Sequence, residues 1–416
     1  MKLEKSFEYL HRAEKVIPVQ SQTFSKGPRY FPKGAAPVYL GYGYGSRVRD
    51  VDKNWYIDFI CGLGPITLGY NYPRVNEAIK EQLANGIIFS LPHPLEVELS
   101  ELLVDIIPCA EMVRFTKTGS EATSAAIKAA RAYTGREKVV CCGYHGWHDW
   151  HSCTTDASRG IPRAMSYLIS PFEYGDIRSL VSILNTEKIA AVIMEPMTIH
   201  PPKDDFLQKV KEVTHQSGAV LIFDEVVTGF RWSLGGAQEY FGVTPDLATF
   251  GKGMSNGMPL NAVVGKKEIM KEYEWGSMVF FSSTFGGECL SLAAGLATIQ
   301  EMREKDTIGY CWKLGQKLID GLNTIGLETI GYPCRPAIIK PFTPEEKTLF
   351  LQEVIKRGIL LHSGFLINLC FSHTEDDIDR AIEACGEAME IVNKTVASGD
   401  WSILKGEIIQ PAFRRI

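Results

Sequence analysis

The chain has 416 residues, 22% of them charged, and a formal net charge of −5, a composition that excludes a disordered or strongly basic protein. No block of Lys and Arg points to nucleic acid as a partner, and no apolar run reaches the roughly 18 residues of a membrane span. Ten cysteines without a Cys-x-x-Cys pair favour reduced thiols in a cytoplasmic protein over a disulfide framework. Residues 1–16 predict an amphipathic helix and lack the apolar centre of a signal peptide.

Helical and strand patterns alternate along the chain, which predicts a mostly parallel sheet with helices on its faces. Residues 45–60 predict a hairpin, because alternating apolar positions flank a turn at residues 52–54. Several helices follow, bounded by signals such as Pro73, Gly86 and Gly135. They are expected at 73–86, 96–107, 120–134 and 290–302.

Continuous apolar runs predict strands that are buried on both faces of a sheet. These runs lie at 139–142, 190–195 and 219–225. The last ~110 residues predict a smaller α+β unit, with a short strand at 367–373 and a helix at 375–393.

Two charged residues stand where a ligand could reach them. Asp224 ends an apolar strand, and ligands of open α/β sheets bind at the carboxyl ends of strands, although a strand-end cap would look the same. Lys252 has glycine on both sides, which lets the backbone approach a ligand closely. A phosphate-binding P-loop is excluded, because Asp246 stands where that motif needs its first glycine.

Asp224 and Lys252 are 252 − 224 = 28 residues apart, about one strand–crossover–strand unit. Enzymes that use pyridoxal 5'-phosphate (PLP) need such a pair. The lysine forms a Schiff base with the cofactor, and the aspartate keeps the pyridine nitrogen protonated so that the ring acts as an electron sink. We therefore predict PLP as the cofactor, with Lys252 as its Schiff-base lysine and Asp224 as the partner of its ring nitrogen.

The phosphate of such a cofactor needs hydrogen-bond donors. Gly119 and Ser120 follow Thr118 at the start of an Ala-rich helix, where free N–H groups and the helix dipole suit an anion. An ordinary N-cap explains the same residues. Tyr144, which follows the strand at 139–142, is a candidate to stack on the cofactor ring.

Histidines recur at three-residue spacing after Tyr144, as they do in some metal sites. These are His145, His148 and His151. No further ligand motif accompanies them, and loop imidazoles usually serve as ordinary hydrogen-bonding groups, so we predict no metal site.

Taken in order, several segments resemble the class III, fold-type I PLP aminotransferases, especially the glutamate-1-semialdehyde aminomutase branch. The likeness runs from about residue 20 to 300. It rests on RDVDKNWYIDFICGLGP, RFTKTGSEATSAAIKAARAYTGREK, YHGWHD, IMEP, LIFDEVVTGFR, YFGVTPDLATFGKGMSNGMPL and STFGGECLSLAAG. The resemblance implies a large domain with a mostly parallel seven-stranded sheet, a smaller α+β domain, and a homodimer with shared active sites. Residues 1–60 would join the small domain, 61–305 would form the PLP-binding domain, and 306–416 would complete the small domain.

The resemblance also implies roles for matching positions. Lys252 would hold the cofactor and shuttle a proton between the substrate carbon and the cofactor, while Asp224 would bind the ring nitrogen. Tyr144 would act with them at the catalytic centre. The other cofactor contacts would be Val226 and Tyr144 on the two ring faces, Gly119 and Ser120 on the phosphate, and Thr284 on the phosphate of the neighbouring subunit. Glu195 and Arg231 match family positions to which chemistry assigns no role.

Some features depart from the aminomutase pattern. About 25 residues separate the Tyr-His-Gly motif from PFEYGD, where the aminomutases carry a long gating loop. SNGMPLNAVVG follows the lysine where the family often has three glycines, and STFGGECL is more similar to transaminases. These departures favour a transaminase that moves an amino group from an amino-acid donor, expected to be glutamate, to an aldehyde or ketone. A sugar-like acceptor is one that the resemblance implies, because the chain is similar to class III enzymes that aminate sugar-like aldehydes or ketones.

Two other functions stay open. An aminomutase would act on glutamate-1-semialdehyde without a separate donor. A non-catalytic binding module of the same fold is disfavoured, because both the lysine and the aspartate are present. Arg29 lies near the position where aminomutases bind the substrate carboxylate, although a surface arginine explains it equally well.

Overall fold

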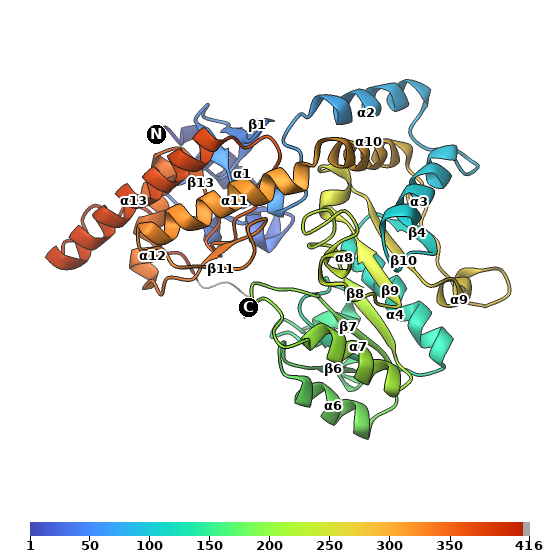
Figure 1. Cartoon of the computed structure of the whole chain (residues 1–416). Coiled ribbons are helices and arrows are strands. Elements are labelled where there is room, and N and C mark those ends of the chain that lie inside the picture. The colour runs from blue at the N-terminus through green and yellow to red at the C-terminus, as the bar shows by residue number, and fades with distance from the viewer. Residues whose placement is uncertain (411–416) are drawn as a thin grey trace. The chain divides into compact units, whose positions relative to one another are not determined.

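The computed structural model describes residues 1–410 of the chain and divides it into two compact units. The small unit contains Met1–Tyr72 and Gly309–Ile416, and the large unit contains Pro73–Ile308. Figure 1 shows the N-terminal segment, in blue, and the segment that contains α11 to α13, in orange to red, together in the small unit.

A seven-stranded sheet forms the centre of the large unit, as predicted. Strand β10 is antiparallel to both of its neighbours, and all the other pairs are parallel. The middle strands are apolar and fully buried, which is why they have no polar face in the sequence. In spatial order the strands are β4 (Met112–Thr116), β10 (Asn261–Gly265), β9 (Leu247–Phe250), β8 (Val220–Asp224), β7 (Ile189–Met194), β5 (Lys138–Cys142) and β6 (Ile169–Pro171).

Helices cover this sheet, and α4 (Gly119–Thr134) shows why they form where they do. Thr118 and Glu121 make a reciprocal capping box at its start, and Gly135 ends it with a φ of 64°. Four of its alanines pack in the core of the unit with residues of the sheet strands, namely Ala125, Ala126, Ala129 and Ala130. The other helices of the large unit are α2 (Pro73–Asn85), α3 (Pro94–Ile106), α5 (Asp149–Ser152), α6 (Ile177–Thr186), α7 (Phe206–Gln216), α8 (Ala237–Phe241), α9 (Lys267–Met270) and α10 (Cys289–Lys305).

The small unit contains the predicted hairpin. Strands β2 (Arg47–Asp50) and β3 (Trp55–Asp58) pair antiparallel, and the turn between them places Lys53 at a φ of 73°. Strand β1 (Leu40–Tyr44) pairs with β2, and β13 (Ile359–Leu360) pairs parallel with β3. The remaining elements are α1 (Glu4–Ala13), α11 (Thr307–Thr324), α12 (Pro344–Lys356), α13 (Glu375–Ser398), and the two-residue strands β11 (Thr329–Ile330) and β12 (Ala337–Ile338).

The strand predicted at 367–373 is wrong. Residues 367–370 form no regular element and residues 371–372 form a turn, because the backbone amides of the segment bond to three different parts of the chain and no ladder forms. Ile367 donates to the carbonyl of Pro336, Asn368 to that of Phe59, and Phe371 to that of Thr67. The alternating apolar pattern reflects burial of the segment, because Ile367, Leu369 and Cys370 are each at most 2% exposed.

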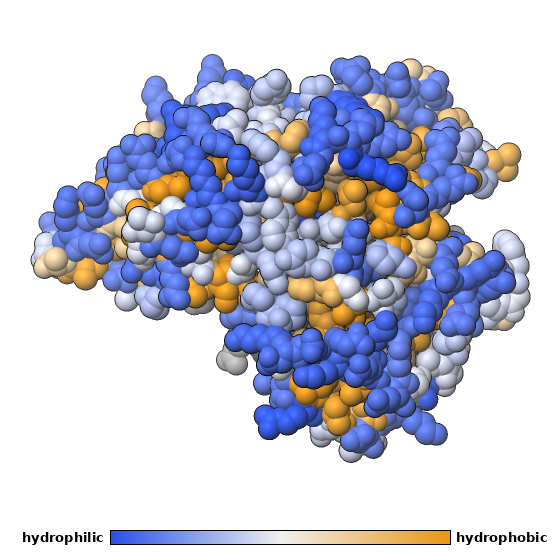
Figure 2. Space-filling view, in the orientation of Figure 1, coloured by the Kyte–Doolittle hydropathy of each residue, from blue (hydrophilic) through white to orange (hydrophobic). Residues whose placement is uncertain are grey.

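No helix within residues 1–410 is both long and apolar enough to cross a membrane. Figure 2 shows hydrophilic side chains over most of one face, with hydrophobic surface exposed in several places of the large unit.

Candidate functional site

The predicted site residues of the large unit gather at one edge of its sheet. Strands β5, β7, β8 and β9 run parallel, so their carboxyl ends lie at the same edge. Two antiparallel steps through β10 bring the end of β4 to this edge as well. The segments that follow these ends begin at residues 117, 143, 195, 225 and 251. Sheets of this kind bind their ligands at this edge.

Asp224 is the last residue of β8 and is only 4% exposed. Its Oδ1 atom accepts hydrogen bonds from the Thr249 hydroxyl at 3.1 Å and from the Val226 amide at 3.2 Å. Its Oδ2 atom lies 2.8 Å from Nδ1 of His145. A buried carboxylate held by three partners has a fixed orientation and is ready to bind a cation.

His145 is a site residue whose role the sequence analysis missed. The ring is 1% exposed, and its Nε2 atom lies 3.1 Å from the carbonyl oxygen of Cys142 while Nδ1 faces Asp224. Both ring nitrogens therefore face oxygen acceptors, and both bonds form together only when the ring carries two protons. The spacing of the histidines suggested metal ligands or loop groups, but the useful signal was that His145 stands three residues after the end of β5.

Lys252 follows β9 and begins a short 3-10 helix, Lys252–Ser255. Its φ of 39° is in the left-handed region, which is costly for a residue with a side chain and tends to persist at functional positions. In the β8–β9 register, Asp224 is paired with Thr249, three residues before Lys252. The lysine and the aspartate therefore lie on neighbouring strand ends, as the proposed pairing around one cofactor requires.

Asn261 is a second residue whose role the sequence analysis missed. Its side chain contacts the segment before Lys252 and the segment before α4. A Cβ atom on Gly251 would lie 1.8 Å from Oδ1 of Asn261, so only glycine fits beside that side chain. The side-chain amide of Asn261 donates a hydrogen bond through Nδ2 to the backbone carbonyl of Lys117 at 3.0 Å. One side chain thus ties the segment before Lys252 to the segment before α4, a link between residues 251 and 117 that sequence patterns do not show.

The start of α4 lies against the same group of segments. A Cβ atom on Gly119 would approach the methyl groups of Val226 to 3.2 and 3.3 Å. The Ser120 hydroxyl accepts a hydrogen bond from the Trp147 amide at 3.2 Å. Gly146 has to be glycine, because its φ is 102° and an added Cβ would lie 2.3 Å from Oγ of Ser120. The predicted phosphate residues and the predicted ring-face residue Val226 are therefore close neighbours.

Tyr144 lies in the segment after β5 and is 38% exposed. Its amide donates to the Glu195 carboxylate at 2.9 Å, and its ring makes an edge contact with His151. Glu195 follows β7 and also packs against Gly143, where an added Cβ would lie 2.6 Å from its carboxylate. Glu195, to which sequence reasoning gave no role, thus holds the backbone that carries Tyr144.

Three further residues were singled out in the sequence, of which Thr284 and Arg231 belong to the large unit and Arg29 to the small unit. Thr284 is exposed in the turn that precedes α10, where the Gly286 amide donates to the Ser283 carbonyl. Arg231 is 6% exposed in the segment after β8. Arg29 is an exposed residue of the small unit, and its guanidinium lies 5.8 Å from the Tyr30 ring.

Glu225 is adjacent to Asp224 in the sequence but has a structural role. It is 0% exposed and accepts hydrogen bonds from the amides of Ala237 and Gln238 at 2.7 and 2.8 Å, and from the Thr228 hydroxyl. Burial raises the pKa of Glu225 to about 7, although these hydrogen bonds lower it. The residue organises the segment 225–238 and is turned away from the site edge.

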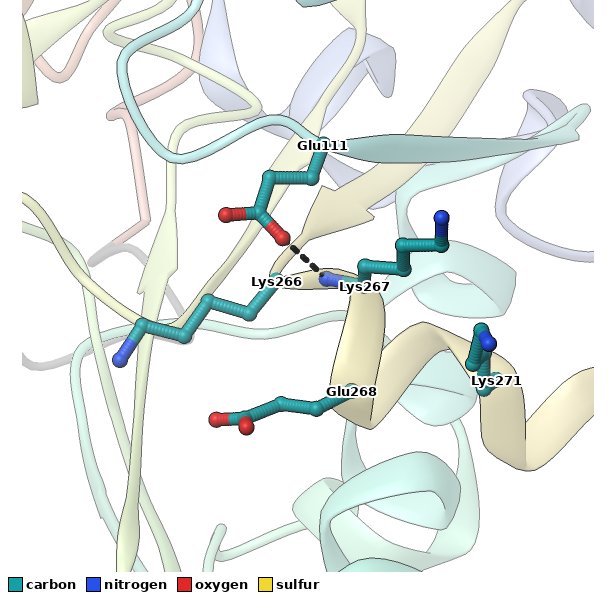
Figure 3. Close-up of a pocket in the computed structure, with 5 residues that line it drawn as sticks. All are labelled: Glu111, Lys266, Lys267, Glu268 and Lys271. Atoms are coloured by element: carbon teal, nitrogen blue, oxygen red, sulfur yellow. Dashed lines mark hydrogen bonds between the residues drawn. The ribbon is translucent and has the colours of Figure 1, made fainter.

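A surface pocket elsewhere in the large unit contains none of the predicted site residues. Figure 3 shows its lining, in which the amide of Lys267 donates to Glu111. The lining residues are Glu111, Lys266, Lys267, Glu268 and Lys271. Because β10 runs antiparallel to its neighbours, its end at Gly265 and the lysines that follow lie at the opposite edge of the sheet.

The residues at the site edge fit PLP. Asp224 offers a fixed carboxylate for a protonated ring nitrogen, Lys252 offers an amine on the next strand end, and Val226 offers an apolar ring face. The first turn of α4 offers N–H groups that have no partner within the helix, together with the Ser120 hydroxyl. The glycines at 119 and 251 leave the room that an ordinary side chain would fill.

Comparisons with known proteins agree with this chemistry. The family described as Aminotransferase class-III matches residues 30–333. The chain is 37% identical to 3-aminobutyryl-CoA aminotransferase of Cloacimonas acidaminovorans over 95% of this chain and 99% of that protein. It is 35% identical to glutamate-1-semialdehyde 2,1-aminomutase of Archaeoglobus fulgidus over 94% of this chain and 100% of that protein.

Solved structures give the same answer. The chain matches an omega-transaminase from Sphaerobacter thermophilus with a TM-score of 0.86 and 26% identity, over 93% of this chain and 98% of that one. It matches the PLP internal aldimine form of the FumI protein from Sphingopyxis sp. MTA144 with a TM-score of 0.88 and 26% identity, over 95% and 98% of the two chains. The protein therefore belongs to the class III aminotransferase family, with the fold-type I architecture, and is a PLP-dependent transaminase.

Proposed function

We propose that the protein transfers an amino group in two half-reactions, from an amino-acid donor such as glutamate to an aldehyde or ketone acceptor. The observation that carries this proposal is the fixed Asp224 carboxylate, held by three partners at the end of the strand beside the one that leads to Lys252. Such an arrangement suits a reaction in which a proton leaves and returns to a carbon that bears nitrogen.

Each residue at the site edge has a distinct task in this proposal. PLP, when bound, supplies the electron sink. The Asp224 carboxylate keeps the ring nitrogen protonated, and His145 orients that carboxylate through its Nδ1–H. Nζ of Lys252 would hold the cofactor covalently, and as a free amine it would carry the proton that leaves and returns to the substrate carbon.

The remaining residues position the cofactor. Gly119 and Ser120 hold the phosphate at the start of α4, where the helix dipole favours an anion. Val226 covers one ring face and Tyr144 the other. Glu195 acts as a positioning residue, because its carboxylate holds the Tyr144 amide.

The proposal includes a homodimer, in which Thr284 reaches the phosphate of the neighbouring subunit. Two segments of the large unit support an interface. Apolar side chains are unusually exposed in both, and the second segment surrounds Thr284. They are Ile87, Ile88, Phe89 and Leu91 in the first segment, and Met278, Phe280 and Phe285 in the second, with exposed fractions from 43% to 93%.

The acceptor is the least defined part of the proposal. The segment after the Tyr144 motif contains only α5 and a 3-10 helix, Arg163–Tyr167, before β6, which leaves little chain for a long lid. A site without a long lid favours a transaminase, in which the first product leaves before the second substrate binds. It disfavours an aminomutase, which must keep its intermediate bound. The sugar-like acceptor is one candidate, and a 3-oxoacyl thioester is another, since one relative is a 3-aminobutyryl-CoA aminotransferase.

Aminomutase activity is the second candidate. Several relatives bear the name glutamate-1-semialdehyde 2,1-aminomutase, with identities such as 41% over 86% of this chain. In that case a single substrate would both give and receive the amino group, and a separate donor would not increase the rate.

A cofactor-spectrum assay separates these functions. The purified protein should absorb visible light, glutamate should bleach that absorbance, and an acceptor from a panel of sugar aldehydes, simple ketones and 3-oxoacyl thioesters should restore it. Lys252→Ala should remove both the covalent absorbance and the turnover. Turnover of glutamate-1-semialdehyde without a donor would replace the transaminase by the aminomutase, and unchanged absorbance in Lys252→Ala would reject the site.

A further inference from the structure

The small unit contains a buried group of three ligand-type side chains that has no part in the proposed reaction. One Sγ atom from each of Cys61 and Cys370 and one ring nitrogen of His373 lie within 4.8 Å of one another. Each of the three residues is at most 1% exposed. Within the described chain, this is the one group of three or more Cys, His, Asp or Glu side chains with such close ligand atoms.

The three side chains come from opposite ends of the sequence. Cys61 begins a 3-10 helix, Cys61–Leu63, just after β3, and Cys370 and His373 lie just before α13. Phe371 and Asn368 bind the backbone of the N-terminal segment at Thr67 and Phe59, so the two segments are already held together around the cluster. Cys61 also has a left-handed φ of 49°, a conformation that side chains adopt only under constraint.

The thiols face main-chain oxygens and the imidazole. Sγ of Cys61 lies 3.3 Å from the Asn368 carbonyl oxygen and 3.5 Å from that of Asp58. Sγ of Cys370 lies 3.2 Å from Nδ1 of His373. The imidazole nitrogen and the two sulfur atoms thus surround one small buried space.

The imidazole of His373 is held in place by burial and by ring stacking. Its ring is 0% exposed and stacks on Phe59 with ring centroids 4.8 Å apart. Nδ1 is the ring nitrogen that lies beside the sulfur of Cys370, so it is the atom that would bind a cation. Nε2 would then carry the ring proton, and it takes no part in the proposed site.

We propose that Cys61, Cys370 and His373 bind one divalent, thiol-preferring cation, with Zn²⁺ as the best match. Two thiolates and a neutral imidazole cancel the charge of a divalent ion, and a neutral complex is the least costly to bury. A monovalent ion would leave one negative charge in a dry interior. Zinc bond lengths of roughly 2.3 Å to sulfur and 2.0–2.1 Å to nitrogen place ligand atoms less than 4 Å apart, so the present spacing needs only a small contraction.

Two adjustments complete the site. The Cys370 amide now donates to Nδ1 of His373 at 3.0 Å, and the ring must tilt out of this bond to give its lone pair to the cation. The fourth tetrahedral position would be taken by an oxygen, for which the Asn368 and Asp58 carbonyls beside Cys61 are the candidates. Asp58 itself is tied to the Tyr70 hydroxyl at 2.6 Å and the Ile60 amide at 2.8 Å, so its carboxylate stays in the surrounding shell.

Complete burial means that the cation would enter as the small unit folds and would leave only when it opens. Binding and folding would then be coupled, as in other structural zinc sites. Because the ligands are 370 − 61 = 309 residues apart, the cation would fasten the two chain ends of the small unit to each other. The proposed role is structural and is independent of the transamination proposed above.

Metal content of the full-length protein, loaded with PLP and produced with zinc in the medium, tests the proposal directly. We expect about one zinc per chain by mass spectrometry of the elements. Cys61→Ser and Cys370→Ser should each reduce zinc to background. Cys385→Ser is the matched control, since Cys385 is also a buried thiol of the small unit, and it should retain the zinc. The PLP absorbance of every variant shows whether the chain has folded.

Cobalt provides a measurement that does not depend on the variants. The full chain, unfolded with a chelator and refolded with Co²⁺, should show the absorption of thiolate-bound tetrahedral cobalt and unfold several degrees higher than chain refolded without metal. Refolded chain that lacks this absorption while it binds PLP would overturn the proposal. So would zinc that is equal in the wild type and both cysteine variants, or a Cys61–Cys370 disulfide in the purified protein, because a disulfide has no thiolate to offer.

Discussion

The two units of this protein bury polar groups in contrasting ways. In the large unit, Asp224 is surrounded by donors from neighbouring segments of one sheet, namely Thr249, Val226 and His145. In the small unit, Cys370 and His373 satisfy each other only in part, and one ring nitrogen of His373 has no partner among the described residues. The first arrangement holds a carboxylate in place at a strand end, whereas the second gathers three possible cation ligands in the interior.

The difference shows two uses of a costly group. A buried carboxylate with three fixed donors cannot turn away, so the remaining attraction is available to a cationic ring nitrogen at no further cost of reorganisation. The buried thiol–imidazole group joins two chain segments of the small unit that are far apart in the sequence. Its effect is therefore on how firmly these segments are held together. The following variants each change one residue of the large unit, and matched variants at other positions serve as controls.

Asp224→Asn should have the largest effect on activity. The amide keeps the shape of the side chain but cannot hold a proton on the ring nitrogen, so kcat should fall on the order of 10²–10³-fold, the usual cost of losing one preorganised electrostatic partner. Rates of the glutamate half-reaction, followed by the cofactor spectrum, measure the loss.

Asp246→Asn is the control for that loss. Asp246 is also buried, but it precedes β9 and pairs with Lys266 at 2.7 Å and His215 at 2.9 Å, at the opposite edge of the sheet. We expect Asp246→Asn to lower stability and to leave the rate per bound cofactor unchanged. Equal rates in Asp224→Asn and the wild type would remove Asp224 from the catalytic centre.

Gly251→Ala should have the next largest effect, on folding and cofactor binding together. The added methyl group would meet Asn261 at 1.8 Å, and overpacking of this severity costs about 3 kcal/mol. Thermal unfolding and PLP titration report the two losses. Gly386→Ala is the matched control, because the helical Gly386 has only ordinary contacts beyond 3.8 Å and alanine should stabilise α13 slightly.

The double variant Gly251→Ala, Asn261→Ala tests the cause. Removing the Asn261 side chain should recover part of the lost stability, because the clash disappears with it. A double variant that is less stable than the sum of the two single changes would mean that the methyl group clashes with something else.

The gathering of the candidate site residues at one edge of the sheet could be predicted in large part because its signals are local. A strand end at Asp224, a glycine-flanked Lys252 and a helix start at Ser120 each lie within a short segment, and a parallel sheet brings such strand ends together. His145 was noticed, but its bond to Asp224 needs the order of β5, β7 and β8 across the sheet. Asn261 carries no signal at all, because its contacts to residues 117 and 251 exist only in the folded chain.

The small unit was harder to predict for the same physical reason. Its core and its cysteine–histidine cluster join chain segments about 300 residues apart, and no spacing rule connects Cys61 to Cys370. The segment 367–373 alternates like a strand, yet its amides bond to three separate segments. An apolar run of this kind reports that the segment is buried, and it does not report whether a neighbouring strand is present.

Glu225→Gln should have an intermediate effect, on stability and on its pH dependence. The amide nitrogen of glutamine would face the N–H groups of Ala237 and Gln238, at a cost of about 2 kcal/mol. Since burial raises the pKa of Glu225 from 4.5 to about 7, the unfolded chain loses this proton first as the pH rises. The contribution of Glu225 to the free energy of unfolding should therefore fall between about pH 4.5 and 7.

Chemical denaturation of both proteins across this pH range measures the difference. The wild type should lose stability more steeply than Glu225→Gln as the pH rises, and the two curves should run parallel above about pH 8. Identical slopes would show that the carboxylate is ionised in the folded state at all these pH values.

Tyr144 should give the smallest effect, and it tests how the exposed side of the cofactor is covered. The ring, rather than the hydroxyl group, should contact the cofactor, so Tyr144→Phe should leave PLP affinity unchanged. Tyr144→Ala should lose one aromatic contact of about 0.5–1.5 kcal/mol, which corresponds to roughly a 2- to 12-fold weaker Kd. We expect a small loss because Tyr144 is 38% exposed. Val226, which is expected on the other ring face, is only 9% exposed, and its backbone N–H is hydrogen-bonded to the Asp224 carboxylate. A loss in Tyr144→Phe as large as in Tyr144→Ala would assign the work to the hydroxyl group, and Tyr144 would then belong with the proton-moving residues at the strand ends.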